Sequence, residues 1–357
     1  MKQFAIHCLF FLAWSLPAPA ATNLASATSL LLDEKTIFEL TAGLSQYEEL
    51  PKLTGKLTSG GSGLVTILIN RWASEFATLY PDVVLDIQGG GSVASLPAFL
   101  QGEVDLMPMG RPLWPSEIKS FRDKFGYEPA QIVVAQDAVG IYVNKNNPLT
   151  GLTLVQLDGI YSRESKRGGK RAEFWRDLGV SGPLAEERII RIALSRAHGT
   201  HDFFRDEVML GEDYRFDVRF EPLSSSLVQA VGAEDAAVGF GSVMFATART
   251  RFVPLPAANG DYLLPSYTNT VSGRYPLVRL MRIVFHCKPD GSMNAAAREF
   301  LRFAVSRRGQ RIISLAQSYP LTLEQEQEAL RVIGETPGAK TAQRRPNAPG
   351  KLPGEMK

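Results

Sequence analysis

Apolar residues follow two alternating patterns along the middle of the chain. Between about Pro51 and Leu323, short runs rich in β-branched residues alternate with segments in which apolar residues recur at helical spacing. This alternation is typical of β-α-β units and predicts an α/β fold with parallel sheet. The clearest predicted strands are residues 83–87, 132–135, 189–193 and 283–285.

The clearest helical pattern lies between residues 64 and 79. Its apolar positions are Leu64, Ile67, Leu68, Trp72, Phe76 and Leu79. They predict an amphipathic helix that stops at Tyr80-Pro81. Two further helices are predicted over residues 293–306 and 307–316, and no internal repeat is visible in the sequence.

The N-terminus has the pattern of a cleavable secretory signal. Lys2 precedes an apolar run over residues 4–16, and Ala18-Pro19-Ala20 supplies a small-residue cleavage site. The run is shorter than the roughly 20 apolar residues that a membrane-spanning helix needs. We therefore expect residues 1–20 to be removed and the mature chain to be a soluble periplasmic protein.

The C-terminal residues 334–357 are rich in proline, glycine and basic residues and lack apolar periodicity, which predicts a disordered tail. The formal net charge of the whole chain is +2. Lys2 in the signal contributes +1 to this charge. The tail contributes +3, because it contains five basic residues and two glutamates, so the net charge of the body is −2. A body this close to neutral argues against a nucleic-acid partner, and any anion site must be local.

Cysteine content and length narrow the class of protein further. Once the signal is removed, Cys287 is the one cysteine left, which excludes an intramolecular disulfide. No cofactor or cysteine-based metal site is expected. The remaining chain is longer than a single hydrophobic core usually supports, so two lobes are expected.

Three glycine- and hydroxyl-rich turns mark the candidate site. They span residues 59–63, 89–92 and 198–200, and each precedes a predicted helix. The first backbone N–H groups of a helix have no intrahelical partner, and the helix dipole adds partial positive charge there. Three such termini, with glycines that admit a ligand and hydroxyls that donate to it, could surround a tetrahedral oxyanion. A single serine or threonine at such a place is more often a simple N-cap.

Enzyme motifs are weak by comparison. The glycine-rich turns match neither the full G-x-S-x-G elbow, nor a Walker A lysine motif, nor the G-x-G-x-x-G fingerprint. His198 and His201 are three residues apart and could share a helix face, but no established metal-binding motif accompanies them, so a metal role is not favoured. We expect a binding protein and no enzyme. An exported hydrolase that pairs His198 with a serine stays open as an alternative.

Short motifs then run through the body in a fixed order. They are Ser59-Gly60-Gly61-Ser62-Gly63, Trp72-Ala73-Ser74-Glu75-Phe76, Tyr80-Pro81, Gly89-Gly90-Gly91-Ser92, residues 105–112, Asn147-Pro148-Leu149, residues 174–179, Gly239-Phe240-Gly241, Tyr275-Pro276-Leu277 and Tyr319-Pro320-Leu321. In order and spacing they resemble the phosphate-binding periplasmic component of ABC transporters. The resemblance covers nearly the entire body.

The resemblance implies a type II periplasmic-binding-protein fold with two lobes joined by a two-strand hinge. Residues 51–136 and 252–330 would form lobe 1, residues 137–251 lobe 2, and residues 21–50 an N-terminal extension. A phosphate ion, or a similar tetrahedral oxyanion, would be clamped between the lobes and delivered to an ABC transporter permease by a monomer. An anion that contacts both lobes would stabilise the closed state.

Eight residues take ligand roles by this resemblance. They are Ser62, Gly63, Ser92, Arg111, Arg196, His198, Gly199 and Thr200. The hydroxyl residue that the family usually has two positions after Ser62 is replaced by Leu64. Arg111 stands where many members have an aspartate, which favours a more negative ligand and removes the acceptor that distinguishes phosphate from sulfate. The alternative for Arg111 is an ion pair with a neighbouring carboxylate.

The third turn departs most from the family pattern. Arg196 is two residues closer to the glycine than in the family, and His198 replaces a serine. A histidine here could donate to an anion, more strongly when protonated. The family's serine cluster survives at residues 224–226 and is expected to cap the helix that follows. These departures leave a second hypothesis open, in which a divergent paralogue acts as a sensor, adhesin or partner-binding module.

Overall fold

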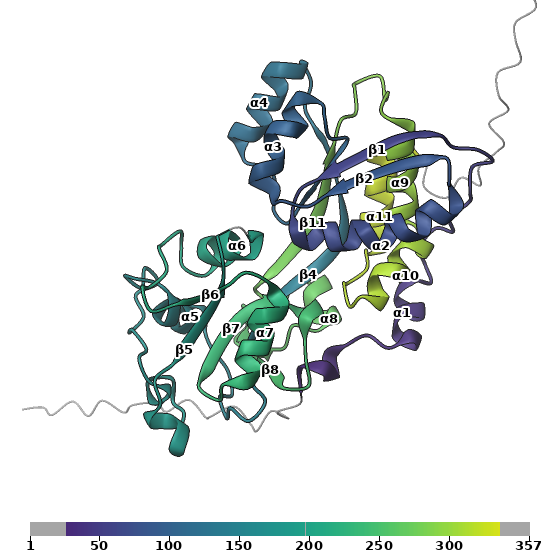
Figure 1. Cartoon of the computed structure of the whole chain (residues 1–357). Helices are drawn as coiled ribbons and strands as arrows, with labels where there is room; N and C mark the ends of the chain where they lie inside the picture. The colour runs from purple at the N-terminus through teal and green to yellow at the C-terminus, as the bar shows by residue number, and fades with distance from the viewer. Residues whose placement is uncertain (1–25, 197, 336–357) are drawn as a thin grey trace, which may run out of the picture.

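A computed structural model describes residues 26–335 except Ala197. The predicted signal and the tail beyond Glu335 lie outside the described residues. Two α/β lobes lie along a diagonal in Figure 1, with long strands passing between them. Within the described ranges, no helix combines the length and the apolar character that crossing a membrane would require.

The described residues contain one nine-stranded sheet that runs through both lobes, in the order β2-β1-β3-β11-β4-β7-β5-β6, with β8 also paired to β4. A separate two-stranded sheet is formed by β9 and β10. The strands are β1 (Gly55–Gly60), β2 (Val83–Gln88), β3 (Leu106–Met109), β4 (Ala130–Asn144), β5 (Ile190–Leu194), β6 (Arg219–Glu221), β7 (Ala237–Ser242), β8 (Thr250–Val253), β9 (Leu255–Pro256), β10 (Tyr262–Leu263) and β11 (Val278–Phe285).

Each lobe has its own parallel strands, as the sequence predicted. β1 pairs in parallel with β2 and β3 in lobe 1, and β5 pairs in parallel with β6 and β7 in lobe 2. β4 and β11 are antiparallel to their neighbours and join the lobes. The predicted strand 132–135 is therefore one end of a longer strand, because β4 continues through the hinge into lobe 2.

The helices cover both faces of this sheet. They are α1 (Glu34–Thr41), α2 (Gly63–Leu79), α3 (Ser92–Gln101), α4 (Pro115–Phe125), α5 (Leu154–Tyr161), α6 (Gly199–Glu207), α7 (Ser224–Ala233), α8 (Tyr267–Val271), α9 (Ala295–Val305), α10 (Arg307–Leu315) and α11 (Leu323–Val332). The long helix predicted from its apolar stripe is α2, whose buried Trp72 donates from Nε1 to the Gly309 carbonyl over 2.8 Å. The predicted pair over residues 293–316 is α9 and α10.

Each lobe has its own hydrophobic core. The core of lobe 1 is built around α2, α9 and β11, with Trp72, Phe76 and Phe300 fully buried. The core of lobe 2 includes side chains from β4, β7 and α7, together with Ala27, Tyr275, Leu277 and Tyr319 from distant segments. The expected boundary near Arg251 thus falls inside the lobe 2 core, because β8 pairs with the lobe 2 end of β4.

Candidate functional site

The first predicted turn forms a tightly packed start to α2. Ser62 is the N-cap residue, is 6% exposed, and donates from its backbone N–H to the Pro108 carbonyl over 2.8 Å. A β-carbon at Gly61 would lie 2.3 Å from the same carbonyl oxygen, so only glycine fits there. Gly63 has open space beside it. Leu64, which stands where the family usually has a hydroxyl residue, packs in the lobe 1 core.

The second turn is bonded to the first. Gly91, the N-cap residue of α3, has a positive φ of 92° and donates from its N–H to the Gly61 carbonyl over 2.9 Å. Ser92 is the first residue of α3, at the helix start that the sequence predicted. A β-carbon at Gly110 would lie 3.6 Å from Ser62 Oγ. Lobe 1 therefore brings together the starts of α2 and α3 and the loop that leads to Arg111.

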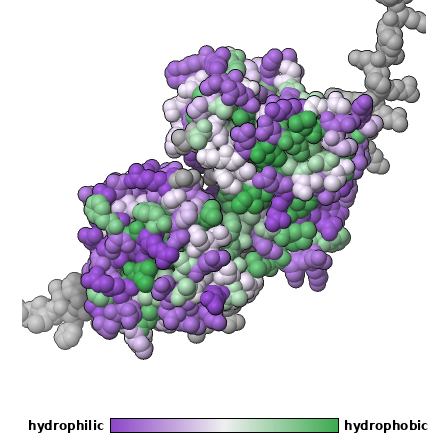
Figure 2. Space-filling model, viewed as in Figure 1, coloured by the Kyte–Doolittle hydropathy of each residue, from purple (hydrophilic) through white to green (hydrophobic). Residues whose placement is uncertain are grey.

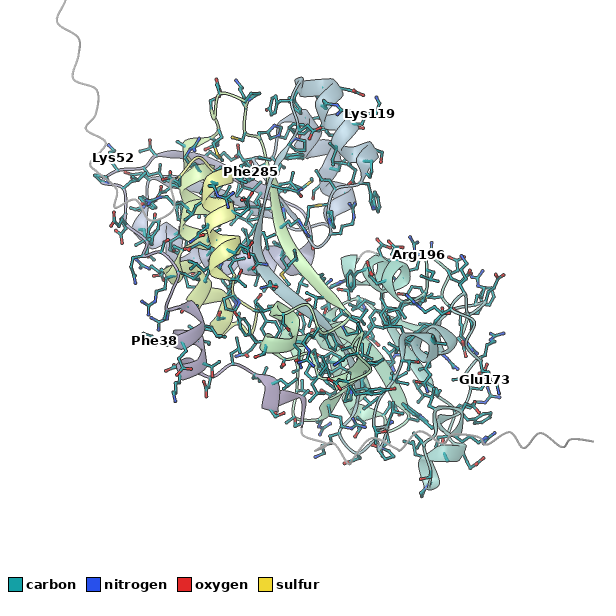
Figure 3. The ribbon with its side chains drawn as sticks, turned by 180° about the vertical axis from the view of Figure 1, so that it is seen from behind. Phe38, Lys52, Lys119, Glu173, Arg196 and Phe285 are labelled. Carbon is teal, nitrogen blue, oxygen red and sulfur yellow. The ribbon has the colours of Figure 1, made fainter. Side chains whose placement is uncertain are left out.

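The third turn begins α6 in lobe 2. His198 is the N-cap residue, and the helix starts at Gly199, within the turn itself. Thr200 is completely buried in the first helical turn, whereas Gly199 is exposed. Arg196 is exposed at the edge of lobe 2, facing the α4 helix of lobe 1 that carries Lys119 (Figure 3).

A buried arginine from the hinge reaches this helix start. Arg279 on β11 is 5% exposed, and its Nη1 donates to Thr200 Oγ1 over 2.8 Å. Its Nε donates to Asp137 Oδ2 over 2.7 Å. Nη2 lies 2.7 Å from the same carboxylate oxygen but makes no hydrogen bond. Arg279 and Asp137 are register partners on β11 and β4, so the two hinge strands themselves hold the guanidinium against α6.

Asp137 is enclosed from the lobe 2 side as well. It is 1% exposed, and its Oδ1 accepts a 2.6 Å hydrogen bond from the Ser242 hydroxyl at the end of β7. Burial raises the pKa of Asp137, against the opposing effects of Arg279 and Ser242, which favour the carboxylate. The guanidinium of Arg279 has five N–H donors, and its two hydrogen bonds to Asp137 and Thr200 leave donors that an anion beside Thr200 could use.

His198 lies between the starts of α6 and α7. Its Nε2 is 3.4 Å from Ser224 Oγ, and its buried Nδ1 has no hydrogen-bond partner among the described residues. Burial, helped by the positive charge of Arg279 and by His201, lowers the pKa of His198 to about 4. The imidazole is therefore neutral at neutral pH while no anion is bound.

The proximity of His198 and Ser224 bears on the hydrolase alternative. A serine nucleophile needs a base that accepts its proton near neutral pH and a third group that orients this base. The pKa of His198 is too low for the first requirement. No described carboxylate bonds to Nδ1, so the second requirement is not met either. The arrangement suits hydrogen bonding to a ligand better than nucleophilic attack.

Arg111 is engaged by a carboxylate of its own lobe. Its Nη1 and Nη2 each donate over 2.8 Å to the two oxygens of Glu117, which is 6% exposed. Nη1 also donates to the Pro112 carbonyl, and the guanidinium lies 3.6 Å from the ring centre of Trp114. Burial opposes ionisation of Glu117, but the hydrogen bonds from Arg111 and from the Trp114 N–H lower its pKa. This is the ion pair that the sequence left open, and a ligand role for Arg111 stays a prediction.

The two halves of the site face each other across the hinge. In Figure 1, α6 lies on the side of lobe 2 that is nearest α3, and Figure 2 shows the surface notched between the lobes. Among the described residues, no hydrogen bond or ion pair links α6 directly to α2, α3 or α4. Among the described residues, Arg279 connects the start of α6 to the hinge strand β11.

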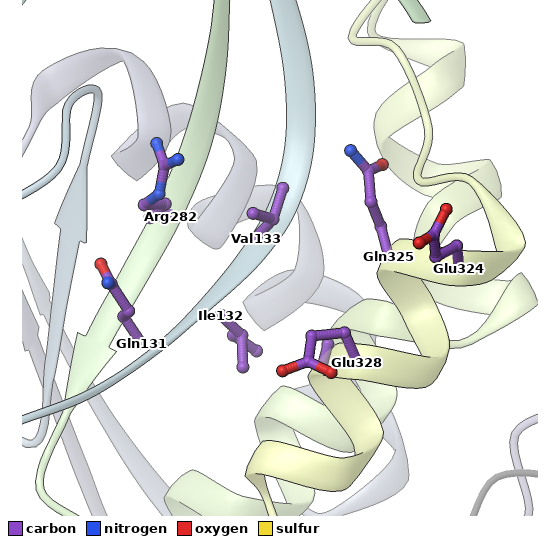
Figure 4. A pocket seen from close by; sticks show the side chains of 8 residues that line it. Gln131, Ile132, Val133, Arg282, Glu324, Gln325 and Glu328 are labelled. Carbon is purple, nitrogen blue, oxygen red and sulfur yellow. The ribbon is translucent and has the colours of Figure 1, made fainter.

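A separate groove lies between α11 and the strands β4 and β11 (Figure 4). Its volume is about 340 Å³, and Arg282, Gln131, Glu324 and Glu328 are among its lining residues. The two glutamates disfavour an anion there, so this groove is no competitor for the site at α6. The described residues contain no cluster of three or more His, Cys, Asp or Glu side chains suited to a metal ion.

Sequence reasoning missed Arg279, Asp137 and Ser242. Arg279 and Asp137 are charged residues within strands that are mostly apolar. A charged residue in such a strand is the signal that could have identified them, since a buried charge needs a partner. The pairing of the two residues was not predictable, because they are 142 positions apart.

Comparisons with known proteins find relatives over most of the chain. Residues 47–308 match a family model described as a PBP superfamily domain. The chain is 31% identical over 293 residues to the phosphate-binding protein PstS of Pseudomonas aeruginosa, covering 82% of this chain and 91% of that protein. It is 28% identical over 264 residues to the phosphate-binding protein PstS of Staphylococcus epidermidis, covering 72% and 77%.

Solved structures show the same fold. One is a phosphate ABC transporter substrate-binding protein from Clostridium perfringens with bound phosphate, with a TM-score of 0.61 and 23% identity over 75% of this chain and 100% of that one. Another is an ABC-type phosphate transport receptor from Vibrio cholerae, with a TM-score of 0.60 and 22% identity over 75% and 100%. The two-lobed α/β fold expected from the sequence is thereby confirmed.

Proposed function

This chain belongs to the PBP superfamily, and we propose that it captures phosphate between its two lobes and delivers it to an ABC transporter. The two PstS relatives, which share the greater part of its length, are phosphate-binding proteins. None of these relatives is described as an enzyme. Capture by two lobes also explains why the candidate residues are divided between lobe 1 and lobe 2.

One observation in this chain carries the proposal. Arg279 is buried in the hinge, contacts the first turn of α6 through Thr200, and has more N–H donors than its hydrogen bonds to Asp137 and Thr200 use. A phosphate at the start of α6 would meet the free backbone N–H groups of that helix, its dipole and this guanidinium together. Such charge-assisted hydrogen bonds are the strong ones in anion recognition.

The ligand shell we propose draws on both lobes. From lobe 1 it takes Ser62 and Gly63 at the start of α2 and Ser92 at the start of α3. From lobe 2 it takes His198, Gly199 and Thr200 at the start of α6. Arg279 joins these because it contacts Thr200 directly.

Arg111 and Arg196 have weaker geometric support. Both Nη atoms of Arg111 donate to Glu117 in this lobe arrangement, so a ligand would have to share the guanidinium with Glu117 or displace that carboxylate. Arg196 is exposed and would reach a phosphate only as the lobes approach each other. Both remain proposed ligands on the family pattern.

The place of action follows from the same family. We propose that the chain is exported by an N-terminal signal and acts in the periplasm as a monomer. Delivery requires that a permease recognise the closed state, in which the anion joins the two lobes.

Isothermal titration of the mature protein with phosphate, sulfate, molybdate and tungstate tests the proposal. We expect heat of binding with phosphate, and the heats with the other three anions measure how far the site discriminates without the aspartate acceptor that Arg111 replaces. Titration of Thr200→Val, which removes the hydroxyl that Arg279 contacts, should show weaker phosphate binding. Absence of binding with all four anions would overturn the proposal and favour a divergent paralogue with another role.

A further inference from the structure

The N-terminal extension contacts both lobes on the outside of the hinge. Its first element is the short helix η1 (Ala27–Leu30), which packs against β8 of lobe 2. Ala27 is 1% exposed and belongs to the lobe 2 core. Val243 and Phe252 of lobe 2 line the small space around it. This end of the extension is thus part of lobe 2.

The other end of the extension is bound to lobe 1. Ile37 and Thr41 of α1 are buried, and α1 packs against α10. The Ser45 N–H donates to Glu326 Oε1 over 2.7 Å, and the Arg307 N–H donates to the Ser45 carbonyl over 2.9 Å. Glu326 is completely buried on α11, so this attachment reaches the interior of lobe 1.

Gln317 holds the middle of the extension. Its Nε2 donates to the Leu32 carbonyl over 3.2 Å, and its Oε1 accepts from the Leu32 N–H over 2.7 Å. Gln317 has a positive φ of 64°, a backbone conformation that residues other than glycine rarely adopt. Two residues later, Tyr319 pairs with Gln136 beside the hinge. The clamp on Leu32 therefore sits at the hinge itself.

This extension lies on the opposite side of the hinge from the candidate site. In Figure 1 the η1 and α1 segment runs along the lower right of the molecule, whereas α6 and α3 face each other at the upper left. Figure 3, turned by 180°, shows the same relation, with Phe38 of α1 on one side and Lys119 and Arg196 on the other. Closure of the notch would rotate the lobes about β4 and β11 and move their outer sides apart.

We propose that residues 26–45 form a strap that stabilises the open arrangement of the two lobes and so sets the affinity for the anion. In the open arrangement both ends of the strap are bound at once. Closure must stretch the strap or release η1 from lobe 2, because its two anchors lie on the side that opens. An anion that favours the closed state must offset the loss of those contacts, and its apparent affinity falls accordingly.

The affinity part of this inference rests on the proposed phosphate binding, whereas the lobe arrangement does not. Two variants of the mature chain release the strap at different places. Ala27→Arg places a charged side chain where η1 enters the lobe 2 core, and Ser29→Arg is its matched control, since Ser29 is exposed on the same short helix. Gln317→Asn keeps an amide and tolerates a positive φ, but is one methylene too short to reach Leu32.

The distance between the lobes is measured without ligand by electron–electron double resonance between two nitroxide labels. The labels are attached at Lys119→Cys on α4 and Asp206→Cys on α6, and Cys287→Ser removes the native cysteine. We expect Ala27→Arg and Gln317→Asn to shift the distance distribution to shorter values and Ser29→Arg to leave it unchanged. Titration with phosphate should show binding about fivefold tighter or more in the two releasing variants.

Unchanged or longer distances in both releasing variants would overturn the strap, because they would show that the extension does not hold the lobes apart. Unchanged phosphate affinity together with shorter distances would overturn its role in setting affinity. If the wild-type protein binds no phosphate, the proposed function fails, and the distance measurement still decides whether the strap exists. Thermal unfolding of each variant confirms that the body is folded.

Discussion

Arg279 Nη1 donates a 2.8 Å hydrogen bond to Thr200 Oγ1, joining a hinge strand to the first turn of a helix in lobe 2. The same guanidinium is paired with Asp137 on the other hinge strand. Both partners are almost completely buried, so the bond is formed away from water. The start of α6 is therefore fixed relative to the hinge, and an anion bound there acts directly on the element about which the lobes move.

Removal of the Arg279 side chain should weaken phosphate binding and destabilise the fold. Arg279→Ala leaves Asp137 buried and unpaired, which costs about 3 to 5 kcal/mol of the free energy of unfolding in typical cases. We expect phosphate affinity to fall by about 2 to 5 kcal/mol, because a buried charge partner is lost from the site. Titration calorimetry and chemical denaturation measure the two effects.

Arg282→Ala is the matched control, because Arg282 lies on the same strand but, among the described residues, its side chain donates only to the Leu280 carbonyl. It should change phosphate affinity little. Equal losses of affinity in the two variants would show that Arg279 has no specific role in the site.

The pKa of His198 predicts how stability changes with pH. The folded protein holds this pKa at about 4, below the ordinary value of 6.5, so between these pH values the unfolded chain binds a proton that the folded chain does not. The contribution of His198 to stability is therefore present above pH 6.5 and is lost as the pH falls towards 4. The loss amounts to about 3 kcal/mol.

His198→Asn removes the titrating group and should flatten this part of the curve. Denaturation of the wild type and the variant at a series of pH values between 7 and 4 gives the difference between their free energies of unfolding. The contributions of the other titrating groups are the same in both proteins and cancel in this difference. Phosphate should reduce the loss in the wild type, because an anion favours the imidazolium. Identical pH dependence in the two proteins would contradict the assignment.

Arg111→Ala distinguishes the two roles left open for this residue. Loss of the guanidinium leaves Glu117 poorly paired at the start of α4, and we expect a decrease in stability of about 1 to 3 kcal/mol. A ligand role adds a loss of phosphate affinity of about 2 to 5 kcal/mol. Unchanged affinity would assign Arg111 to the ion pair alone. Arg122→Ala on α4, which breaks an exposed ion pair with Glu128 beyond the end of that helix, should affect neither quantity measurably.

Gly61→Ala tests the packing that joins the first two turns. Its β-carbon would lie 2.3 Å from the Pro108 carbonyl oxygen, so the loop must move and the bond from Gly91 to Gly61 is strained. We expect a loss of about 1 to 3 kcal/mol in stability and weaker phosphate binding. Gly63→Ala, two residues later in open space, should leave the melting temperature unchanged. A melting temperature for Gly61→Ala equal to that of the wild type would refute the expected clash.

The local elements followed from the sequence because their causes are local. The apolar stripe from Leu64 to Leu79 and the stop before Pro81 placed α2 to within a residue at each end. The glycine and hydroxyl residues at 61–63, 91–92 and 198–200 identified three helix starts. Periodicity and turn chemistry act over a few residues, so a linear pattern is enough to predict them.

The partners of buried charges were decided only by the tertiary structure. Nothing near Arg279 in the sequence indicates that it pairs with Asp137. For Arg111 the sequence allowed either a ligand or a carboxylate as partner, and the structure shows it bonded to Glu117. The N-terminal extension likewise gave no sign that Ala27 would enter one lobe while Ser45 is bound to the other. The sequence by itself determined the lobes, the helix starts and the family. Which side chains meet at the hinge depends on contacts between distant segments, and these exist only once both cores have packed.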